Sequence, residues 1–295
     1  MAVKTVQYIF NGKTYNLTYN STSGKYEATV TAPGKSSYGQ TDHVLGGTVK
    51  ATDVAGNTAT VDQSHATLGA SLKIRVKEKV APVISITEPT TGSYITTATP
   101  AIKFKVTDAD SGVNAGTIAL KIDGTAATRI AKTAVTGGYE CSYTPSTALS
   151  DGAHTISVTA SDNDGNASAA KTATFTIDTV PPTLSVTAPV DNLVTNKNTV
   201  TITGKTDDIT SKPVTVTVNG TAVTVATDGT FSKDVTLVNG SNTITIVAKD
   251  KSGKTTTVTR KVTLDTAAPV IKSITLTPNP VDCGKTFVIA VEVTD

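Results

Sequence analysis

The stretch Thr155-Ile156-Ser157-Val158-Thr159, followed by Ala160-Ser161-Asp162-Asn163-Asp164-Gly165-Asn166, decides the fold class because it contains a strand and the turn that ends it. In the first part, apolar residues alternate with polar ones, a period of two that is typical of a half-buried strand. Its β-branched side chains fit a pleated surface better than a helix. In the second part, Asp side chains can bond their own backbone and Gly accepts a positive φ, so a β-hairpin is predicted.

Similar hairpins occur twice more along the chain, which is the mark of a repeat protein. Ala51-Thr52-Asp53-Val54-Ala55-Gly56-Asn57 follows the strand-like run 47–50. Ala248-Lys249-Asp250-Lys251-Ser252-Gly253-Lys254 follows the run 243–247. Each precedes another alternating run, so each hairpin is expected to join the last two strands of a module.

Proline marks the start of each later module. Val80-Ala81-Pro82-Val83-Ile84, Val180-Pro181-Pro182-Thr183-Leu184 and Ala268-Pro269-Val270-Ile271 share a pattern, and their prolines are spaced by 100 and 87 residues. Proline has no N–H donor, so it suits the first position or the edge of a strand. We therefore predict an all-β protein of tandem β-sandwich modules in an elongated array, with modules at 1–79, 80–179, 180–267 and 268–295.

Composition excludes several classes of protein. The 295 residues carry a net charge of +2, with scattered charges and no Trp, which argues against nucleic-acid binding. No apolar run is long enough to insert into a membrane, and no signal peptide follows Met1, so we expect neither membrane insertion nor general secretion of the chain as written. Cys141 and Cys283 fall in different modules, so no module is expected to hold an internal disulfide.

The last predicted module, 268–295, contains only two strands. Two strands cannot bury a core by themselves. Three expectations stay open: truncation or an assembly boundary, strand addition to another subunit or module, or disorder. Phe287, Ile289 and Val291 are the candidate interface residues of this segment.

No catalytic constellation is visible, so we predict that the protein is not an enzyme. His43, His65 and His154 lack helical or His-x-His spacing and are expected at the surface. Cys141 lies in an alternating run and is expected to be a buried or half-buried structural thiol. No cofactor is expected, apart from a weak case for calcium.

The calcium case rests on two acidic loops of the second module. Asp162 and Asp164 flank a Gly turn, and Asp108 and Asp110 stand in a similar loop. Oxygen ligands at alternate positions around a turn are typical of Ca²⁺ loops, whereas the alternative interpretation is two Asx turns. Because Val54 and Lys251 replace the second acid elsewhere, any such site is expected in the second module alone.

The first module is rich in tyrosine. Tyr15, Tyr19 and Tyr26 are candidate interface residues, although the alternation of Tyr15, Leu17 and Tyr19 also suits a core without Trp.

The Asp-Thr-x-x-Pro junctions at 178–182 and 265–269 and the Ala-x-Asp hairpins at 51–57 and 160–166 resemble bacterial immunoglobulin-like repeats. The resemblance implies an Ig-like sandwich for each module. Residues 10–21 and 24–33 are similar to the start of Ig-like tail proteins of phages and prophages of Gram-positive bacteria.

This resemblance implies a structural or adhesive component of a phage-like particle, in the tail or baseplate region. Such a protein would assemble in the host cytoplasm with other particle subunits or copies of itself, and would attach to a carbohydrate or protein of the host surface. The alternative is an adhesin at the bacterial cell surface, or an Ig-like spacer of a larger secreted protein.

Overall fold

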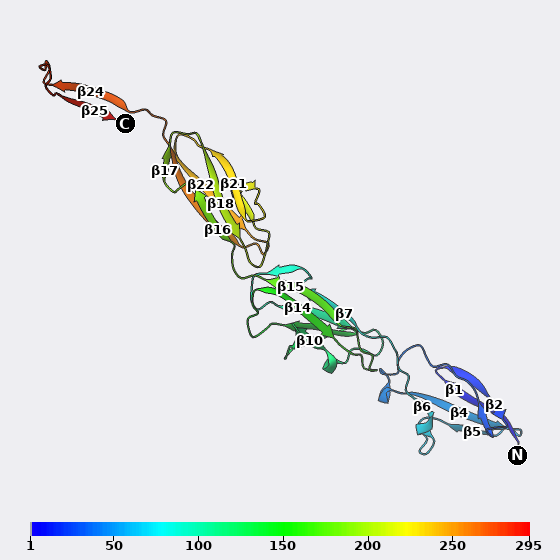
Figure 1. Ribbon diagram of the computed structural model, residues 1–295. Helices are drawn as coiled ribbons and strands as arrows, with labels where there is room; N and C mark the ends of the chain where they lie inside the picture. Colours follow the sequence, from blue (N-terminus) through cyan, green and yellow to red (C-terminus); the bar gives the residue numbers. More distant parts are fainter. Residues whose placement is uncertain (1) are drawn as a thin grey trace. The chain divides into compact units, whose positions relative to one another are not determined.

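The computed structural model describes residues 2–295, and these form β-strands and three short 3₁₀ turns (Figure 1). The all-β class predicted from the sequence is therefore confirmed. The chain divides into two compact units, residues 1–177 and 178–295. Among the described residues, no helix has the length and apolar character needed to cross a membrane.

The first module is a single antiparallel sheet in the order β3-β2-β1-β4-β5, with β6 paired to β4. Its elements are β1 (Val3–Phe10), β2 (Lys13–Asn20), β3 (Lys25–Glu27), η1 (Thr41–His43), β4 (Leu45–Asp53), β5 (Thr58–Val61), η2 (Gly69–Leu72) and β6 (Lys73–Ile74).

This single sheet differs from the predicted sandwich because the first module has too few apolar side chains to fill a second layer. Only Phe10 and Val76 are buried among its described large apolar residues. Phe10 stacks on Tyr8 with ring centroids 5.6 Å apart. Gly47 lies opposite Phe10 on β4, where a side chain would collide with the Tyr8 ring. Loop residues 28–44, instead of a second sheet, lie between β3 and β4.

The second module is a sandwich of two sheets, β12-β13-β9-β7 and β11-β10-β14-β15-β8. Its elements are β7 (Val83–Glu88), β8 (Ser93–Ile95), β9 (Ile102–Thr107), η3 (Ala115–Thr117), β10 (Ala119–Ile122), β11 (Thr125–Ala126), β12 (Ala131–Val135), β13 (Gly138–Tyr143), β14 (Gly152–Thr159) and β15 (Lys171–Ile177).

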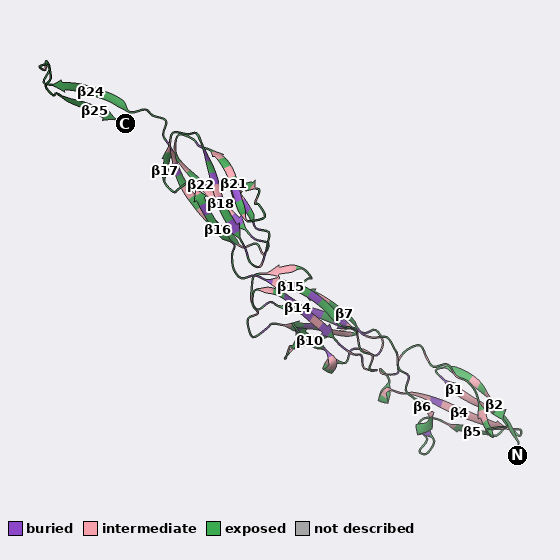
Figure 2. Ribbon diagram, viewed as in Figure 1, coloured by how far each residue is buried: buried purple, intermediate pink, exposed green. Residues whose placement is uncertain are grey.

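Strict alternation builds the core of this sandwich. Along β9 the inward residues Ile102, Phe104 and Val106 are almost fully buried, and the residues between them are exposed. Cys141 pairs with Phe104 across β13 and β9 and is buried, as expected for a structural thiol. Burial raises the pKa of the Cys141 thiol. Figure 2 shows the buried residues concentrated in the strands of the second and third modules.

The third module repeats this design with the sheets β16-β18-β21 and β17-β23-β22-β19-β20. Its strands are β16 (Thr183–Ala188), β17 (Leu193–Thr195), β18 (Thr199–Asp207), β19 (Thr215–Val218), β20 (Thr221–Val223), β21 (Thr230–Thr236), β22 (Gly240–Lys249) and β23 (Thr255–Leu264). In both sandwiches the chain passes from one sheet to the other between its first two strands. The first strands, β7 and β16, lie in one sheet, and the short second strands, β8 and β17, pair parallel to the last strands, β15 and β23, in the other.

The C-terminal hairpin consists of β24 (Val270–Thr277) and β25 (Val288–Thr294), and every residue of the two strands is exposed. Their register places Ile274 beside Val291 and Leu276 beside Ile289, so one face of the hairpin is apolar. Phe287 is also exposed. These residues form no part of the two hydrophobic cores.

His154 departs from its predicted surface position. It is 6% exposed on β14, and its ring lies 5.6 Å from that of Phe175. Its Nδ1 is 2.7 Å from the Asp123 carboxylate and its Nε2 is 2.8 Å from the Ser150 carbonyl. Burial alone would lower the pKa of His154, but the two hydrogen bonds together with the negative charge of Asp123 raise the pKa above its ordinary value of 6.5.

This geometry predicts a pH-dependent stability of the second module. A histidine whose pKa is raised by folding stabilises the fold fully below pH of about 6.5, and the contribution is lost as pH rises through the folded pKa. Urea denaturation between about pH 6 and about pH 8.5 should show this decline in the wild type. His154→Gln should flatten it, whereas His65→Gln, at an exposed position, should leave it unchanged. An identical pH profile for His154→Gln would contradict the assignment.

The core of the third module predicts a second result. Ile246 is fully buried, so Ile246→Ala should lower the free energy of unfolding by about 2–5 kcal/mol through lost transfer energy and a residual cavity. Val238 is 71% exposed, and Val238→Ala should change the free energy of unfolding by less than about 0.5 kcal/mol. Denaturant titration of the two variants checks the difference, and equal effects would argue against the packing described.

Candidate metal centres

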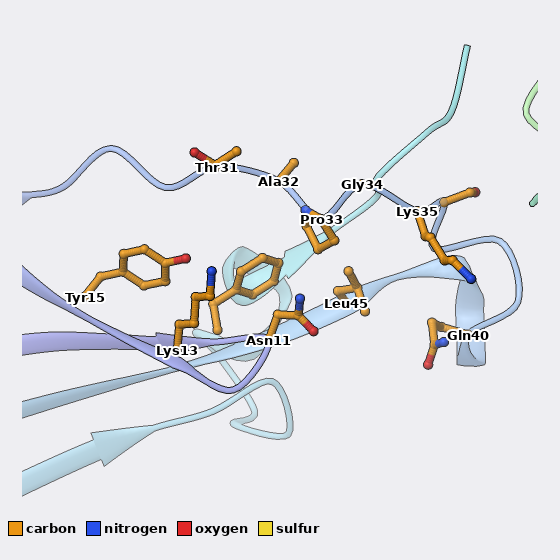
Figure 3. Close-up of a pocket in the computed structure, with 12 residues that line it drawn as sticks. Asn11, Lys13, Tyr15, Thr31, Ala32, Pro33, Gly34, Lys35, Gln40 and Leu45 are labelled. Carbon is orange, nitrogen blue, oxygen red and sulfur yellow. The ribbon is translucent and has the colours of Figure 1, made fainter. Parts of the chain in front are cut away.

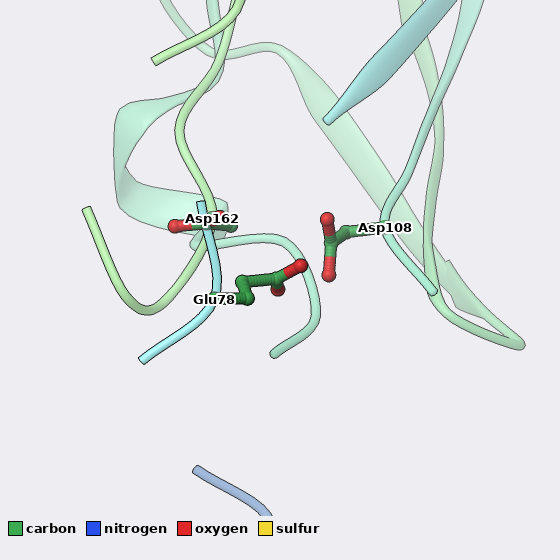
Figure 4. A group of neighbouring side chains, drawn as sticks. All are labelled: Glu78, Asp108 and Asp162. Atoms are coloured by element: carbon green, nitrogen blue, oxygen red, sulfur yellow. The ribbon is translucent and has the colours of Figure 1, made fainter. Parts of the chain in front are cut away.

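Three acidic side chains of the first unit converge near the start of the second module. Glu78, Asp108 and Asp162 each offer a carboxylate oxygen, and the three oxygens lie within 4.8 Å of one another (Figure 4). Asp108 and Asp162 are buried, and Glu78 is half-buried. Glu78 comes from the segment that leads into β7, Asp108 follows β9, and Asp162 belongs to the hairpin between β14 and β15.

Local hydrogen bonds fix these acids. Asp108 Oδ1 accepts from the backbone N–H groups of Asp110 at 3.0 Å and Gly112 at 2.8 Å. Asp162 accepts from Asn166 twice, at 2.8 Å from the backbone and 2.6 Å from the side chain. Glu78 Oε1 accepts from the Ser111 backbone at 2.7 Å. Asp108 and Asp162 are therefore held by their own loops, whereas Glu78 is held by the loop that carries Asp108.

The charges of this cluster are not neutralised by a basic side chain. None of its three acids takes part in an ion pair among the described residues. Burial raises the pKa of Glu78, and the Asp108 carboxylate raises it further, against the opposing hydrogen bond from Ser111. A cation between the carboxylates would remove this repulsion.

A second cluster lies in the other unit and is more deeply buried. The carboxylates of Asp178, Asp208 and Asp250 also offer oxygens within 4.8 Å of one another, and the three residues are 0%, 6% and 5% exposed. The Thr210 and Ser211 backbones donate to Asp208 Oδ1 at 2.7 and 2.6 Å. The Ser211 hydroxyl donates to Asp178.

Asp250 carries the clearest sign of a missing partner. Its Oδ1 accepts from Ser252 Oγ at 2.8 Å and from the Lys254 backbone at 2.9 Å. Its Oδ2 is buried and has no hydrogen-bond partner within the described chain. An unpaired buried carboxylate oxygen is costly, and no ion pair of the described residues reaches this cluster.

The donor set suits a hard divalent cation. Calcium binds carboxylate and other oxygens at about 2.3–2.6 Å, so two oxygens on one ion are at most about 5 Å apart. Both clusters meet that limit with three carboxylates each. They contain neither sulfur nor imidazole, the donors that zinc prefers. Each cluster could therefore hold a calcium ion, completed by further oxygens or water.

The four acids predicted for calcium separate into two groups. Asp108 and Asp162 meet in the first cluster. Asp110 Oδ2 instead accepts from the Ser36 backbone at 2.8 Å. Asp164 Oδ2 accepts from the Ser36 hydroxyl at 2.5 Å and from the Glu78 backbone at 3.1 Å. Asp110 and Asp164 therefore attach a loop of the first module to the second.

Sequence reasoning missed Glu78 and the whole second cluster, although a spacing could have found them. Glu78 and Asp178 each lie four residues before a junction proline, Pro82 or Pro182. Asp108 and Asp208 each lie 26 residues after the same prolines. The expectation that only the second module could hold a metal thus does not match the geometry. That expectation considered pairs of acids in a single loop, whereas each cluster combines acids from three separate segments.

The predicted interface residues lie at two separate places. Tyr15 and Tyr26 are half-buried on β2 and β3, while Tyr19 is 55% exposed, with its ring 5.3 Å from that of Tyr26. Phe287, Ile289 and Val291 are exposed in the C-terminal hairpin and the loop before β25. Their role in binding stays a prediction.

The two sandwiches, in each of which the first two strands belong to different sheets, define a protein of tandem immunoglobulin-like modules. Residues 85–179 match the bacterial Ig-like domain family. Residues 182–266 match domain B of glucodextranase. These two segments correspond to the second and third modules.

Among curated proteins, the chain is similar to bacillopeptidase F of Bacillus subtilis (strain 168), with 36% identity over 126 residues. The matching segment covers 43% of this chain and 9% of that protein. The chain thus resembles a small part of a much longer enzyme. Ig-like modules are typically non-catalytic.

Several solved structures are similar in fold. Fibronectin(III)-like modules of Clostridium thermocellum CbhA match with 19% identity and a TM-score of 0.39, covering 62% of this chain and 94% of that one. A bacterial ice-binding adhesin matches with 21% identity and a TM-score of 0.32, covering 88% and 86%. A tetra-tandem repeat from the extending region of a large adhesion protein matches with 20% identity and a TM-score of 0.34, covering 98% and 79%. Nothing about function follows from these low scores.

Metal binding at the two clusters predicts a stability response. Calcium at about 10 mM should raise the free energy of unfolding by about 1.4–2.7 kcal/mol per site, if the dissociation constant is about 10⁻⁴–10⁻³ M as in extracellular calcium modules. The double variant Asp162→Asn/Asp250→Asn should lose this gain, because each cluster loses one carboxylate ligand. Calorimetry of both chains with and without calcium measures the gain.

The matched control is Asp53→Asn. Asp53 occupies the same hairpin position in the first module and accepts from Asn57 as Asp162 does from Asn166, but it is only half-buried and belongs to neither acidic cluster. Its calcium response should equal that of the wild type. A wild-type chain that does not respond to calcium would rule out both centres.

Proposed function

We propose that this chain is a non-catalytic spacer of a bacterial surface or secreted protein, in which calcium fixes the segments that lead into the second and third modules. The observation that carries the proposal is the composition of the two acidic clusters. Each combines one acid from a junction segment, Glu78 or Asp178, with two acids from loops of the module that follows. A shared cation would therefore tie the junction to the module.

The need for such a tie follows from the size of the modules. A sandwich of about 90 residues buries only about 60–65% of its unfolded surface, so its stability is modest. A junction segment without a partner would move freely, so it could not fix the orientation of one module relative to the next. Calcium concentrations outside cells suit weak three-carboxylate sites. A cell-surface or extracellular location agrees with the bacterial Ig-like match.

A non-catalytic role is supported by the state of the reactive side chains. His154 is held between Asp123 and Ser150 inside the second module. The Cys141 thiol is buried and its pKa is raised, which disfavours the thiolate nucleophile. The chemistry of bacillopeptidase F and glucodextranase is a property of those proteins, and it is not proposed for this chain.

A phage-particle role is the second candidate, and it rests on the sequence of the first module, residues 10–33. The family and structural matches add no support to it. It predicts that the intact chain sediments with particles at fixed stoichiometry, whereas the spacer role predicts its recovery from cell-surface or secreted fractions. Mass spectrometry of the two fractions separates the candidates.

The partner of the C-terminal hairpin is proposed to be further strands of an Ig-like sandwich. The pair Ile271 and Val293 occupies the same positions, counted from Pro269, as Ile84 and Val106 counted from Pro82. In the second module that pair belongs to the core under the second sheet. The apolar face of β24 and β25 would be covered in the same way.

The spacer proposal is tested by small-angle X-ray scattering with and without calcium. Calcium should narrow the distribution of interatomic distances in the wild type, because the junction segments become fixed. Glu78→Gln/Asp178→Asn should abolish the change. Asp265→Asn, at the corresponding position before Pro269, should retain it, since Asp265 belongs to neither cluster. Scattering that is insensitive to calcium in the wild type would overturn the mechanical role.

A further inference from the structure

A groove of about 720 Å³ opens on the first module (Figure 3). It lies between loop residues 31–35 on one side and the turn that joins β1 to β2, with the start of β4, on the other. This volume is within the range of small-ligand sites, about 300–1,000 Å³. The two acidic clusters contribute no residue to it.

The floor of the groove is aromatic and apolar. Phe10 is buried at the end of β1, and Tyr15 is half-buried on β2. The register pairs Tyr8 with Tyr15 and Phe10 with Lys13, so these side chains share one face of the sheet. Pro33 in the loop and Leu45 at the start of β4 add apolar walls, as Figure 3 shows.

The rim is basic and rich in amides. The exposed side chains of Lys13 and Lys35 both line the groove, and neither forms an ion pair in the part of the chain that the structure describes. Asn11 and Gln40 supply neutral hydrogen-bonding groups. None of the lining residues is acidic. Two free ammonium groups over an apolar floor favour an anionic ligand.

The loop that forms one wall is anchored at its end. Ser36 donates to Asp110 and Asp164, and the Ser37 hydroxyl is buried and donates to the His43 carbonyl at 2.7 Å. The backbone N–H of Ser37 donates to the Val76 carbonyl at 2.9 Å. These bonds keep the groove formed without a ligand, which lowers the entropic cost of binding.

We propose that this groove binds an anionic oligosaccharide. The C–H face of a sugar ring would lie against Tyr15 and Pro33, its hydroxyl groups would meet the Asn11 and Gln40 amides, and its carboxylate groups would face Lys13 and Lys35. Alternating apolar, amide and ammonium groups match a ligand that carries a ring face, hydroxyls and charge on each unit. This binding role goes beyond the spacer role and does not depend on the metal centres.

The test is calorimetric titration of the full chain with a hexamer of galacturonic acid at about 0.15 M salt. The buffer contains no added calcium, because uronates bind calcium themselves. Saturable binding is expected, with maltohexaose, a neutral hexamer, at least about tenfold weaker. Lys13→Gln/Lys35→Gln should weaken uronate binding by at least about tenfold, and so should Tyr15→Ala. Lys121→Gln/Lys171→Gln removes two exposed charges elsewhere and should leave binding unchanged.

Three outcomes would overturn the proposal. The first is no binding of the uronate hexamer. The second is equal loss of binding in the Lys121→Gln/Lys171→Gln control, which would mean attraction by net charge alone. The third is equally tight binding of a hexamer of glutamate, which would assign the groove to acidic peptides. Because the lysines are exposed, their substitution leaves the fold intact, and thermal unfolding of the Tyr15→Ala variant identifies a loss caused by misfolding.

Discussion

Mutual repulsion among buried carboxylates is the constraint on which the module junctions depend. Asp178, Asp208 and Asp250 are almost entirely removed from water, their carboxylates lie close together, and no ion pair of the described residues reaches them. Backbone N–H groups satisfy only part of each carboxylate. A divalent cation at this cluster would offset the repulsion and would link folding at the junction to the ionic composition of the surroundings.

The sandwiches themselves rest on a simpler principle. Their cores are mainly aliphatic, and Phe104, Phe175 and Phe231 are the buried phenylalanines of the second and third modules. Along β9, alternation places every second side chain in the core and leaves the residues between them toward water. Such cores are small, so each module gains from any contact that orders its first and last segments.

The sequence therefore predicted the strands, the hairpins and the all-β class, because these depend on local periodicity and turn chemistry. It did not predict the acidic clusters, because Asp108 and Asp162 come together only through the packing of two sheets, and Glu78 arrives from a junction. It also placed His154 at the surface, because the sequence does not reveal that its two ring nitrogens form hydrogen bonds with Asp123 and Ser150. The single sheet of the first module was missed because its tyrosines alternate as core residues do.

The Ala-x-Asp hairpin shows how one local motif acquires different chemistry. In all three modules its Asp accepts the backbone N–H group four residues later, at 2.8 Å in the first two and 2.9 Å in the third. In the first module the Asp53 carboxylate also accepts from the Asn57 side chain at 2.8 Å, and it belongs to no acidic cluster. In the other two, the packed sheets bring two more acids to the same turn. The Asx turn orients one carboxylate, and tertiary packing then brings two further carboxylates beside it to form the proposed metal centre.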